Sequence, residues 1–177
     1  MLLLVTRCAG FLTFSKKQIA DVTAQPIEWH VIVLSLLFGG LFAGRLVAEQ
    51  DVLFFLVMGL AAGLGFTYAT SFFLAWLIRL SGKPIAAQPI RMIVGYSLAP
   101  FILGLLFIIL AEHQMFPKMS ALNFALIVLT WFLQVHGIKV VANIPWIQAL
   151  FVSVIPILAL MLVIALLFKI AWMVYGY

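Results

Sequence analysis

Charged side chains are scarce in this sequence: Asp, Glu, Lys and Arg together make up 8% of its 177 residues, whereas hydrophobic residues make up 67%. A soluble domain carries about 25% charged residues, because its surface faces water. The shortage of charge therefore excludes an ordinary water-exposed globule and indicates that most of the outer surface faces lipid.

Cysteine is limited to Cys8, which excludes an intrachain disulfide and a cysteine-rich metal site. The metalloprotease pattern His-Glu-x-x-His, the Gly-Lys-Ser/Thr phosphate loop and the hydrolase pattern Gly-x-Ser-x-Gly are all absent. The five acidic residues lie near the ends of apolar runs, which argues against a buried proton relay. We therefore expect no catalytic residue, no metal and no cofactor, and hence a protein that is not an enzyme.

Basic residues outnumber acidic ones by ten to five, for a net charge of +5. They are scattered along the chain, which suits contact with anionic lipid headgroups better than tracking of a phosphate backbone. We expect membrane lipids as partners, and no nucleic acid.

Five long apolar runs follow a more polar start. A membrane-spanning helix needs about 20 apolar residues; by this measure the fourth run is short and the second and fifth are long. The pattern predicts an all-α polytopic membrane helix bundle with about five transmembrane helices. The runs cover residues 29–47, 52–80, 90–111, 121–135 and 146–172.

Residues 11–25 are too polar to span a membrane. Ser15 and Gln18 have the spacing of a helix-capping box, and three apolar residues fall near one helical face. These three are Phe11, Ile19 and Val22. We expect a short amphipathic helix along the membrane interface; an irregular leader is the alternative.

The basic residues also predict how the chain is oriented. With the N-terminus in the cytoplasm, that side holds seven Lys and Arg residues against three on the other side, which favours N-inside and C-outside. The seven are Arg7, Lys16, Lys17, Arg79, Lys83, Arg91 and Lys139, and the three are Arg45, Lys118 and Lys169. We therefore expect a cytoplasmic and interfacial segment over residues 1–28 and a transmembrane bundle over residues 29–177.

Glycines four residues apart mark the first two runs: Gly40 and Gly44 in the first, Gly59 and Gly63 in the second. Small residues at this spacing let two helix backbones approach closely, which favours association within lipid. The partner of each stripe is either another helix of this chain or a second copy.

Two prolines lie inside the runs, Pro100 in the third and Pro156 in the fifth. Each removes a backbone hydrogen bond and bends its helix. Such bends either shape the bundle or create a cavity for transport.

Polar side chains near Pro100 are candidates for a small polar seam inside the bundle. They are Thr67, Tyr68, Ser71, Tyr96 and Ser97. Ordinary hydrogen bonds between helices explain them equally well.

His30 and His136 fall near the cytoplasmic ends of the first and fourth runs, where they could approach each other and hold a haem or metal. We favour the simpler interpretation, in which each caps its helix at the interface.

Arg79, Lys83 and Arg91 surround a proline-containing loop that is the best cytoplasmic contact surface. It could bind anionic lipid or an acidic partner, or it could serve only to set the topology.

Residues 79–106 read RLSGKPIAAQPIRMIVGYSLAPFILGLL, in which a run ends in a short basic loop with glycine. The next run begins with a basic residue and carries the segment Tyr-Ser-x-x-Pro, here residues 96–100. This stretch resembles the hallmark region of the Yip (Ypt-interacting protein, YIPF) membrane family. Residues 14–19 are similar to the lead-in of bacterial members, which more usually have Pro where Ser15 stands. Trp131, Gly137 and Ala149 resemble the family's fourth span, its loop and the start of its fifth.

The resemblance implies a five-helix bundle with a cytosolic N-terminus, and it is closest to short members of the bacterial inner membrane. Eukaryotic relatives act in vesicle trafficking with Rab-type GTPases through a long cytosolic N-terminal region, whereas about 28 residues precede the first run here. We therefore do not extend GTPase binding to this chain. We expect a non-enzymatic membrane protein that acts by association, as a scaffold or accessory subunit of a complex or as an organiser of the membrane, with a protein partner or a homo-oligomer. The alternative is a small oligomeric transporter or channel.

Overall fold

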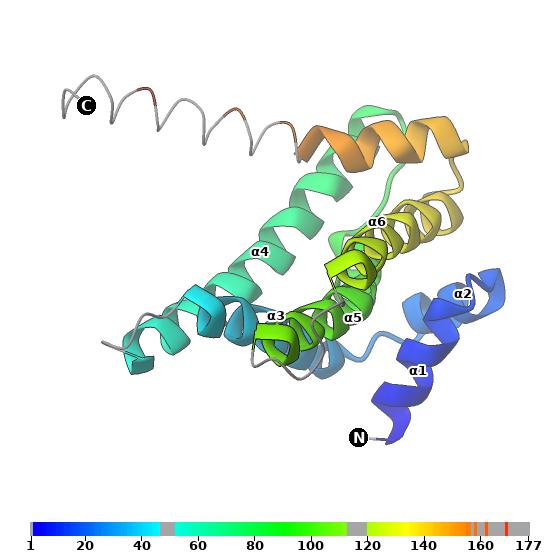
Figure 1. The fold of residues 1–177 in the computed structure, drawn as a ribbon. Coiled ribbons are helices and arrows are strands. Elements are labelled where there is room, and N and C mark those ends of the chain that lie inside the picture. Colours follow the sequence, from blue (N-terminus) through cyan, green and yellow to red (C-terminus); the bar gives the residue numbers. More distant parts are fainter. Residues whose placement is uncertain are drawn as a thin grey trace.

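The structure is a computed structural model that describes residues 2–46, 52–112 and 120–156, together with Leu158, Leu162 and Lys169. The described residues form helices and their connections, with no strand among them, which confirms the all-α expectation (Figure 1). The helices are α1 Leu2–Leu12, α2 Lys16–Ala24, α3 Glu28–Leu46, α4 Val52–Leu80, α5 Ala87–Glu112 and α6 Ser120–Ala142. A shorter helix, Trp146–Pro156, follows α6.

Three of these helices are long and apolar enough to cross a membrane: Leu53–Leu80, Ala87–Ile109 and Phe124–Ala142. A fourth span results if α2 and α3, which meet at a bend of 106°, are counted together. The described residues thus give three or four spans, against the five expected from the sequence. Most of the expected fifth span follows Pro156 and lies outside the continuously described residues. Lys118, which precedes α6, also lies outside the described residues.

The helix α6 extends beyond the apolar run from which it was expected. The run was expected to end at Val135, yet α6 continues to Ala142. Gly137 lies against Ile93 of α5, and Ile138 is fully buried, so the last two turns of α6 still pack on the bundle. Packing between helices therefore extends the helix through the stretch that holds His136, Gly137 and Lys139.

The N-terminal segment forms two helices, where a single one was expected over residues 11–25. Between α1 and α2 the chain turns at Phe14, whose φ angle of 55° lies in the left-handed region. Ser15 immediately precedes α2, but its side chain makes no capping hydrogen bond. Ile19 and Val22 are buried, and α2 packs against α5 and α6. This segment is thus a folded part of the molecule.

The helix α5 lies at the centre of the bundle and packs against α3, α4 and α6 (Figure 1). Residues 92–98 are buried on every face of the helix. A helix that is apolar all round is typical of such an enclosed position. Pro100 is also buried, and α5 continues as a helix through it, whereas Pro156 lies at the limit of the continuously described residues.

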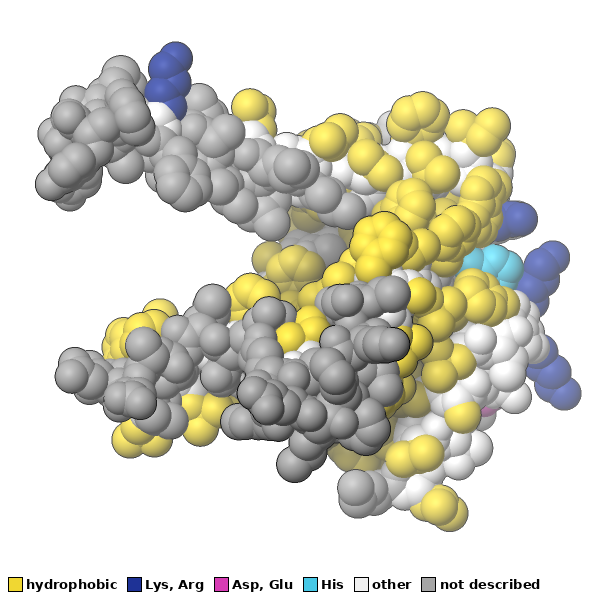
Figure 2. Space-filling view, in the orientation of Figure 1, with side chains coloured by type: hydrophobic (Ala, Val, Ile, Leu, Met, Phe, Trp, Pro, Cys, Tyr) yellow, Lys and Arg dark blue, Asp and Glu magenta, His cyan; other side chains and the backbone are white. Residues whose placement is uncertain are grey.

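Basic side chains gather at one end of the bundle. The last turns of α4 and α6 carry Arg79 and Lys139, and α2, which packs near these ends, carries Lys16 and Lys17. Figure 2 shows Lys and Arg side chains projecting mainly from this edge, while hydrophobic side chains cover most of the remaining described surface. We call this edge, with the connection from α4 to α5, the basic end.

Candidate functional site

The closest approach between helices lies where α3 crosses α4. A Cβ atom added to Gly63 would fall 2.8 Å from the Cα atom of Gly39, and one added to Gly59 would fall 2.6 Å from the Gly39 carbonyl oxygen. Real Cβ atoms do not approach backbone this closely, so the crossing requires glycine on both helices. Gly59 and Gly63 therefore face another helix of the same chain.

On α3 the glycine at this crossing is Gly39 and not Gly40, which the sequence analysis had named. A Cβ atom added to Gly40 would meet only side-chain atoms, those of Leu60 at 3.2 Å and of Leu56 at 3.8 Å. The stripe on α3 reads Ser35, Gly39 and Ala43, each four residues from the next. Gly44 lies one position after this stripe, within the last turn of α3.

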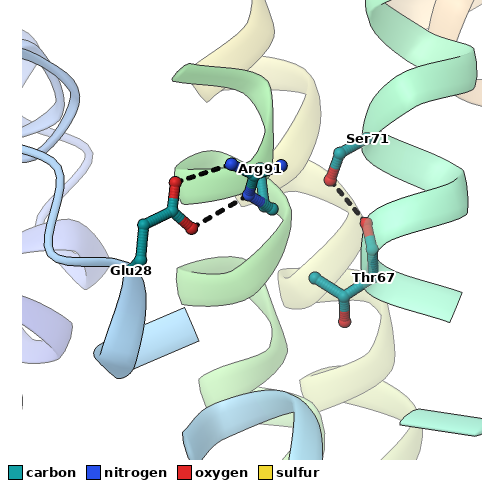
Figure 3. Close-up of polar contacts among 4 residues, drawn as sticks. All are labelled: Glu28, Thr67, Ser71 and Arg91. Carbon is teal, nitrogen blue, oxygen red and sulfur yellow. Dashed lines mark hydrogen bonds and ion pairs between the residues drawn. The ribbon is translucent and has the colours of Figure 1, made fainter. Parts of the chain in front are cut away.

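Buried hydroxyl groups continue the same crossing. The Ser35 hydroxyl lies 2.8 Å from the Thr67 hydroxyl, and the Ser71 hydroxyl donates to the Thr67 carbonyl oxygen at 2.5 Å (Figure 3). Thr67 in turn donates to the carbonyl oxygen of Gly63 at 3.0 Å. Ser35, Thr67 and Ser71 are fully buried. The contact between Ser35 and Thr67 joins α3 to α4, whereas the other two bonds lie within α4.

The other members of the expected polar seam bond elsewhere. The Tyr96 hydroxyl lies 2.5 Å from Nδ1 of His30, and the Ser97 hydroxyl donates to the carbonyl oxygen of Val94 at 2.8 Å. Phe11 of α1 stacks on the Tyr96 ring, with 5.9 Å between the centroids. The polar residues thus form separate contacts, of α3 with α4 and of α3 with α5, and do not line one continuous seam.

The two histidines have different partners. While His30 bonds to Tyr96, Nε2 of His136 bonds to the carbonyl oxygen of Phe14 at 3.0 Å. Among the described residues, no group of three or more His, Cys, Asp and Glu side chains is placed to hold a metal ion. The His136 bond holds the turn between α1 and α2 against α6.

Arg91 forms an ion pair that the sequence analysis did not foresee. Its guanidinium donates two hydrogen bonds to the Glu28 carboxylate, at 2.6 and 3.0 Å, which joins the first turns of α3 and α5 (Figure 3). The guanidinium carbon also lies 4.5 Å from the centre of the Tyr68 ring, which is 37% exposed. Such paired and stacked geometry is typical of arginine. Arg91 is therefore engaged within the bundle.

The other two residues of the expected contact loop are at the surface. Arg79 and Lys83 are exposed, and Nε of Arg79 donates to the carbonyl oxygen of Ile85 at 2.7 Å. Gly82, between them, has a φ angle of 84°, in the region that favours glycine. The loop therefore presents two exposed cations at the basic end.

A cavity of about 570 Å³ lies between α3, α4, α5, α6 and the helix Trp146–Pro156. Large apolar side chains dominate its walls, among them Phe38, Phe66, Phe73, Phe101, Ile127 and Trp131. The cavity is partly open to the outside of the bundle.

Cys8 of α1 provides a chemical test of how this helix packs. Burial raises the pKa of the Cys8 thiol from 9.0 to about 11, which reduces the thiolate at pH 8 by roughly 100-fold. Because the thiolate is the reactive form, we expect maleimide to label Cys8 at least 30-fold more slowly than an exposed cysteine, with a rate that rises as pH is raised toward 11.

The matched control for Cys8 is A20C in a C8S background, because Ala20 is exposed on α2. Labelling rates would be measured on the reconstituted protein between pH 7 and pH 10. Equal rates at both positions would show that α1 does not pack as described.

The arrangement defines a class, that of a polytopic α-helical membrane protein. Its helices are joined by close glycine contacts, by buried hydroxyls and by the ion pair of Glu28 with Arg91. The family model of the Yip1 domain matches residues 13–168, which is most of the chain. The chain therefore belongs to the Yip1 family, as its resemblance in residues 79–106 indicated. No similar sequence was found among curated proteins, and no similar fold among solved structures.

Proposed function

We propose that this protein acts by association in the membrane, as a non-enzymatic scaffold or accessory subunit bound to a second copy or to another membrane protein. Gly59 and Gly63, whose expected partner was either another helix of this chain or a second copy, are occupied by the contact of α4 with α3. The surface for a partner must then lie elsewhere on the bundle.

The observation that carries the proposal is the exposure of the N-terminal part of α4. Six consecutive residues, 53–58, have between 39% and 75% of their surface exposed. At about 100° per residue, six positions cover the whole circumference of a helix. The C-terminal part of α4 is different, because Leu74 and Ile78 are fully buried there. Helices associate in lipid by packing their surfaces, and this part of α4 offers phenylalanine, leucine and valine side chains for such packing.

Transport is supported less well. A polar solute requires a path lined with unpaired polar groups or charges. The hydroxyls of Thr67, Ser71 and Ser97 instead bond to carbonyl oxygens of their own helices. The cavity beside α5 is bounded mainly by apolar side chains. These features favour a bundle that associates over one that conducts.

We also propose that the basic end faces the cytoplasm, in the inner membrane of a bacterium, with α1 and α2 lying along the interface and the fifth span completing the bundle. The basic side chains at this end support the orientation under the positive-inside rule. The 106° bend between α2 and α3 supports an interfacial course for α2, because a helix at that angle to a spanning one runs along the membrane.

Photo-crosslinking tests the proposed partner surface. A photoreactive amino acid would replace Phe54 or Val57 in the exposed part of α4, and Phe72 near its other end, which is 67% exposed, provides the control. We expect protein crosslinks from the first two positions and lipid adducts only from Phe72. Differently tagged copies would separate self-association from a foreign partner. Lipid adducts alone at all three positions would contradict the proposal.

A further inference from the structure

The cavity between the helices communicates with the outer, lipid-facing surface of the bundle. Two of its lining residues, Phe66 and Ile127, are 43% and 39% exposed. On the same two helices, Phe72 and Phe124 are 67% and 70% exposed. The cavity is thus continuous with the surface that contacts lipid, and its contents can enter from the bilayer.

The walls favour hydrocarbon over water. Of the polar residues on the lining, Thr130 and Ser153 donate to the carbonyl oxygens of Leu126 and Ala149, one turn earlier in their own helices. The indole nitrogen of Trp131, which also lines the cavity, is buried and has no hydrogen-bond partner among the described residues. A buried water needs two to four polar partners. Gln134 and Thr70 are the remaining polar side chains on an otherwise apolar lining.

A second groove follows closer to the basic end. It has a volume of about 540 Å³ and lies between the end of α4 and the helix Trp146–Pro156, with Leu77 and Val152 among its walls. Leu77 is one turn beyond Phe73, and Val152 adjoins Ser153, so the two hollows follow each other along the same pair of helices.

The length of this path fits one leaflet of a bilayer. From Phe66 to Leu80 the helix α4 rises about 21 Å, at about 1.5 Å per residue. Half of a bilayer, including its headgroup region, measures about 20–22 Å. At the basic end of the path, Arg79 and Lys83 are exposed in the loop that follows α4. The apolar part of the path thus lies at the depth of the acyl chains in that leaflet, and the two cations lie at the depth of the phosphate groups.

We propose that the cavity binds one acyl chain of an anionic phospholipid from the leaflet at the basic end, with Arg79 and Lys83 attracting its phosphate. The acyl chain fills the volume between the aromatic walls. Because hydrocarbon forms no hydrogen bonds, the hydroxyls on the lining keep their bonds to carbonyl oxygens of their own helices. The site needs neither a partner protein nor a particular orientation in the cell, so it can fail or succeed independently of the proposed function.

A phospholipid with a photoreactive diazirine near the end of its acyl chain tests the site. The full chain would be reconstituted in phosphatidylcholine vesicles with a small fraction of labelled phosphatidylglycerol or labelled phosphatidylcholine. After illumination, mass spectrometry locates the adducts. We expect Phe101 and Trp131 to carry at least five times more adduct per exposed area than Phe72 and Phe124, and phosphatidylglycerol to label them more than phosphatidylcholine does.

Two variants fill the cavity, A69F and the smaller A69L, because Ala69 lines it. The control is A62F, since Ala62 is exposed on the same helix and lies two turns away. We expect A69F to reduce the cavity adducts at least fivefold and A69L to reduce them partly, with no change in A62F. The graded pair keeps the test valid if A69F does not fold.

Neutral variants test the headgroup contact. R79Q/K83Q should abolish the preference for phosphatidylglycerol, whereas K16Q/K17Q, which removes two cations from α2, should retain it. Adducts in proportion to exposure and unchanged by A69F and A69L would overturn the proposal. A preference that R79Q/K83Q leaves intact would overturn the headgroup contact.

Discussion

Replacing Gly63 by alanine should destabilise the bundle by about 3 kcal/mol, whereas the same change at Gly65, two residues further along α4, should leave its stability unchanged or slightly higher. The added Cβ atom at Gly63 would fall 2.8 Å from the Cα atom of Gly39 and closer still to the carbonyl oxygen of Ser35. Backbone atoms cannot rotate away as a side chain can, so the two helices must separate, and overpacking of this kind costs about 1–3 kcal/mol or more. The separation would also strain the hydrogen bond between Ser35 and Thr67.

Gly65 is a matched control, because nothing lies within 4 Å of a Cβ atom added there. Alanine is also favoured over glycine inside a helix by about 0.5–1 kcal/mol. Unfolding by SDS in mixed micelles, followed by circular dichroism, gives the stability of each variant. G39A and G40A extend the comparison to α3, where we expect a large loss at Gly39 and a small one at Gly40. Equal losses at Gly63 and Gly65 would refute the described crossing.

The second large effect should follow from loss of the pair between Glu28 and Arg91. We expect R91Q to cost about 1–2 kcal/mol, because two charge-assisted hydrogen bonds of 2.6 and 3.0 Å are lost and the Glu28 carboxylate keeps no equivalent partner. The side chains are 20% and 33% exposed, so solvent screening keeps the loss below that of a fully buried pair. The contact with the Tyr68 ring would weaken as well.

A double-mutant cycle isolates this contact. If E28Q and R91Q each destabilise the protein, the free energy of unfolding lost in the double variant should be at least 1 kcal/mol smaller than the sum of the two single losses. K16Q is the control, since Lys16 is exposed, and it should change the stability by less than about 0.5 kcal/mol. Strictly additive losses would mean that Glu28 and Arg91 do not interact.

Much of the helical layout was predictable, because apolar periodicity reports where a helix faces lipid or the core. The starts of α4 and α6 fall within one residue of the apolar runs, and the end of α4 coincides with its run. The end of α6 was misjudged for a physical reason: His136, Gly137 and Lys139 look like a loop in sequence. The structure pairs each with a neighbour, namely Phe14, Ile93 and Trp146.

The register of α3 could not be decided from spacing alone. Two overlapping patterns of small residues occur there, Gly40 with Gly44 and Gly39 with Ala43, and both have the interval of four that close packing requires. The second faces α4, where Ser35 continues the stripe and meets Thr67. The hydroxyl of Ser35, four residues before Gly39, was the feature of the sequence that could have identified the correct register.

Side-chain contacts between residues far apart in the sequence could not be predicted from a single sequence. Glu28 and Arg91 are 63 residues apart, and His30 and Tyr96 are 66 apart. Each pair became visible only when α3 was placed against α5. The expected topology did put Glu28 and Arg91 at the same end of neighbouring helices, and an acid facing a base at that depth could have been proposed from it.

The central claim is that this Yip1-family protein functions while bound to another membrane protein chain. The most direct test is native mass spectrometry of the protein released from its own membrane in a mild detergent. We expect a stoichiometric assembly heavier than the 19.7 kDa chain by at least one further protein, either a second copy or a partner. A bare chain carrying only lipid would contradict the claim.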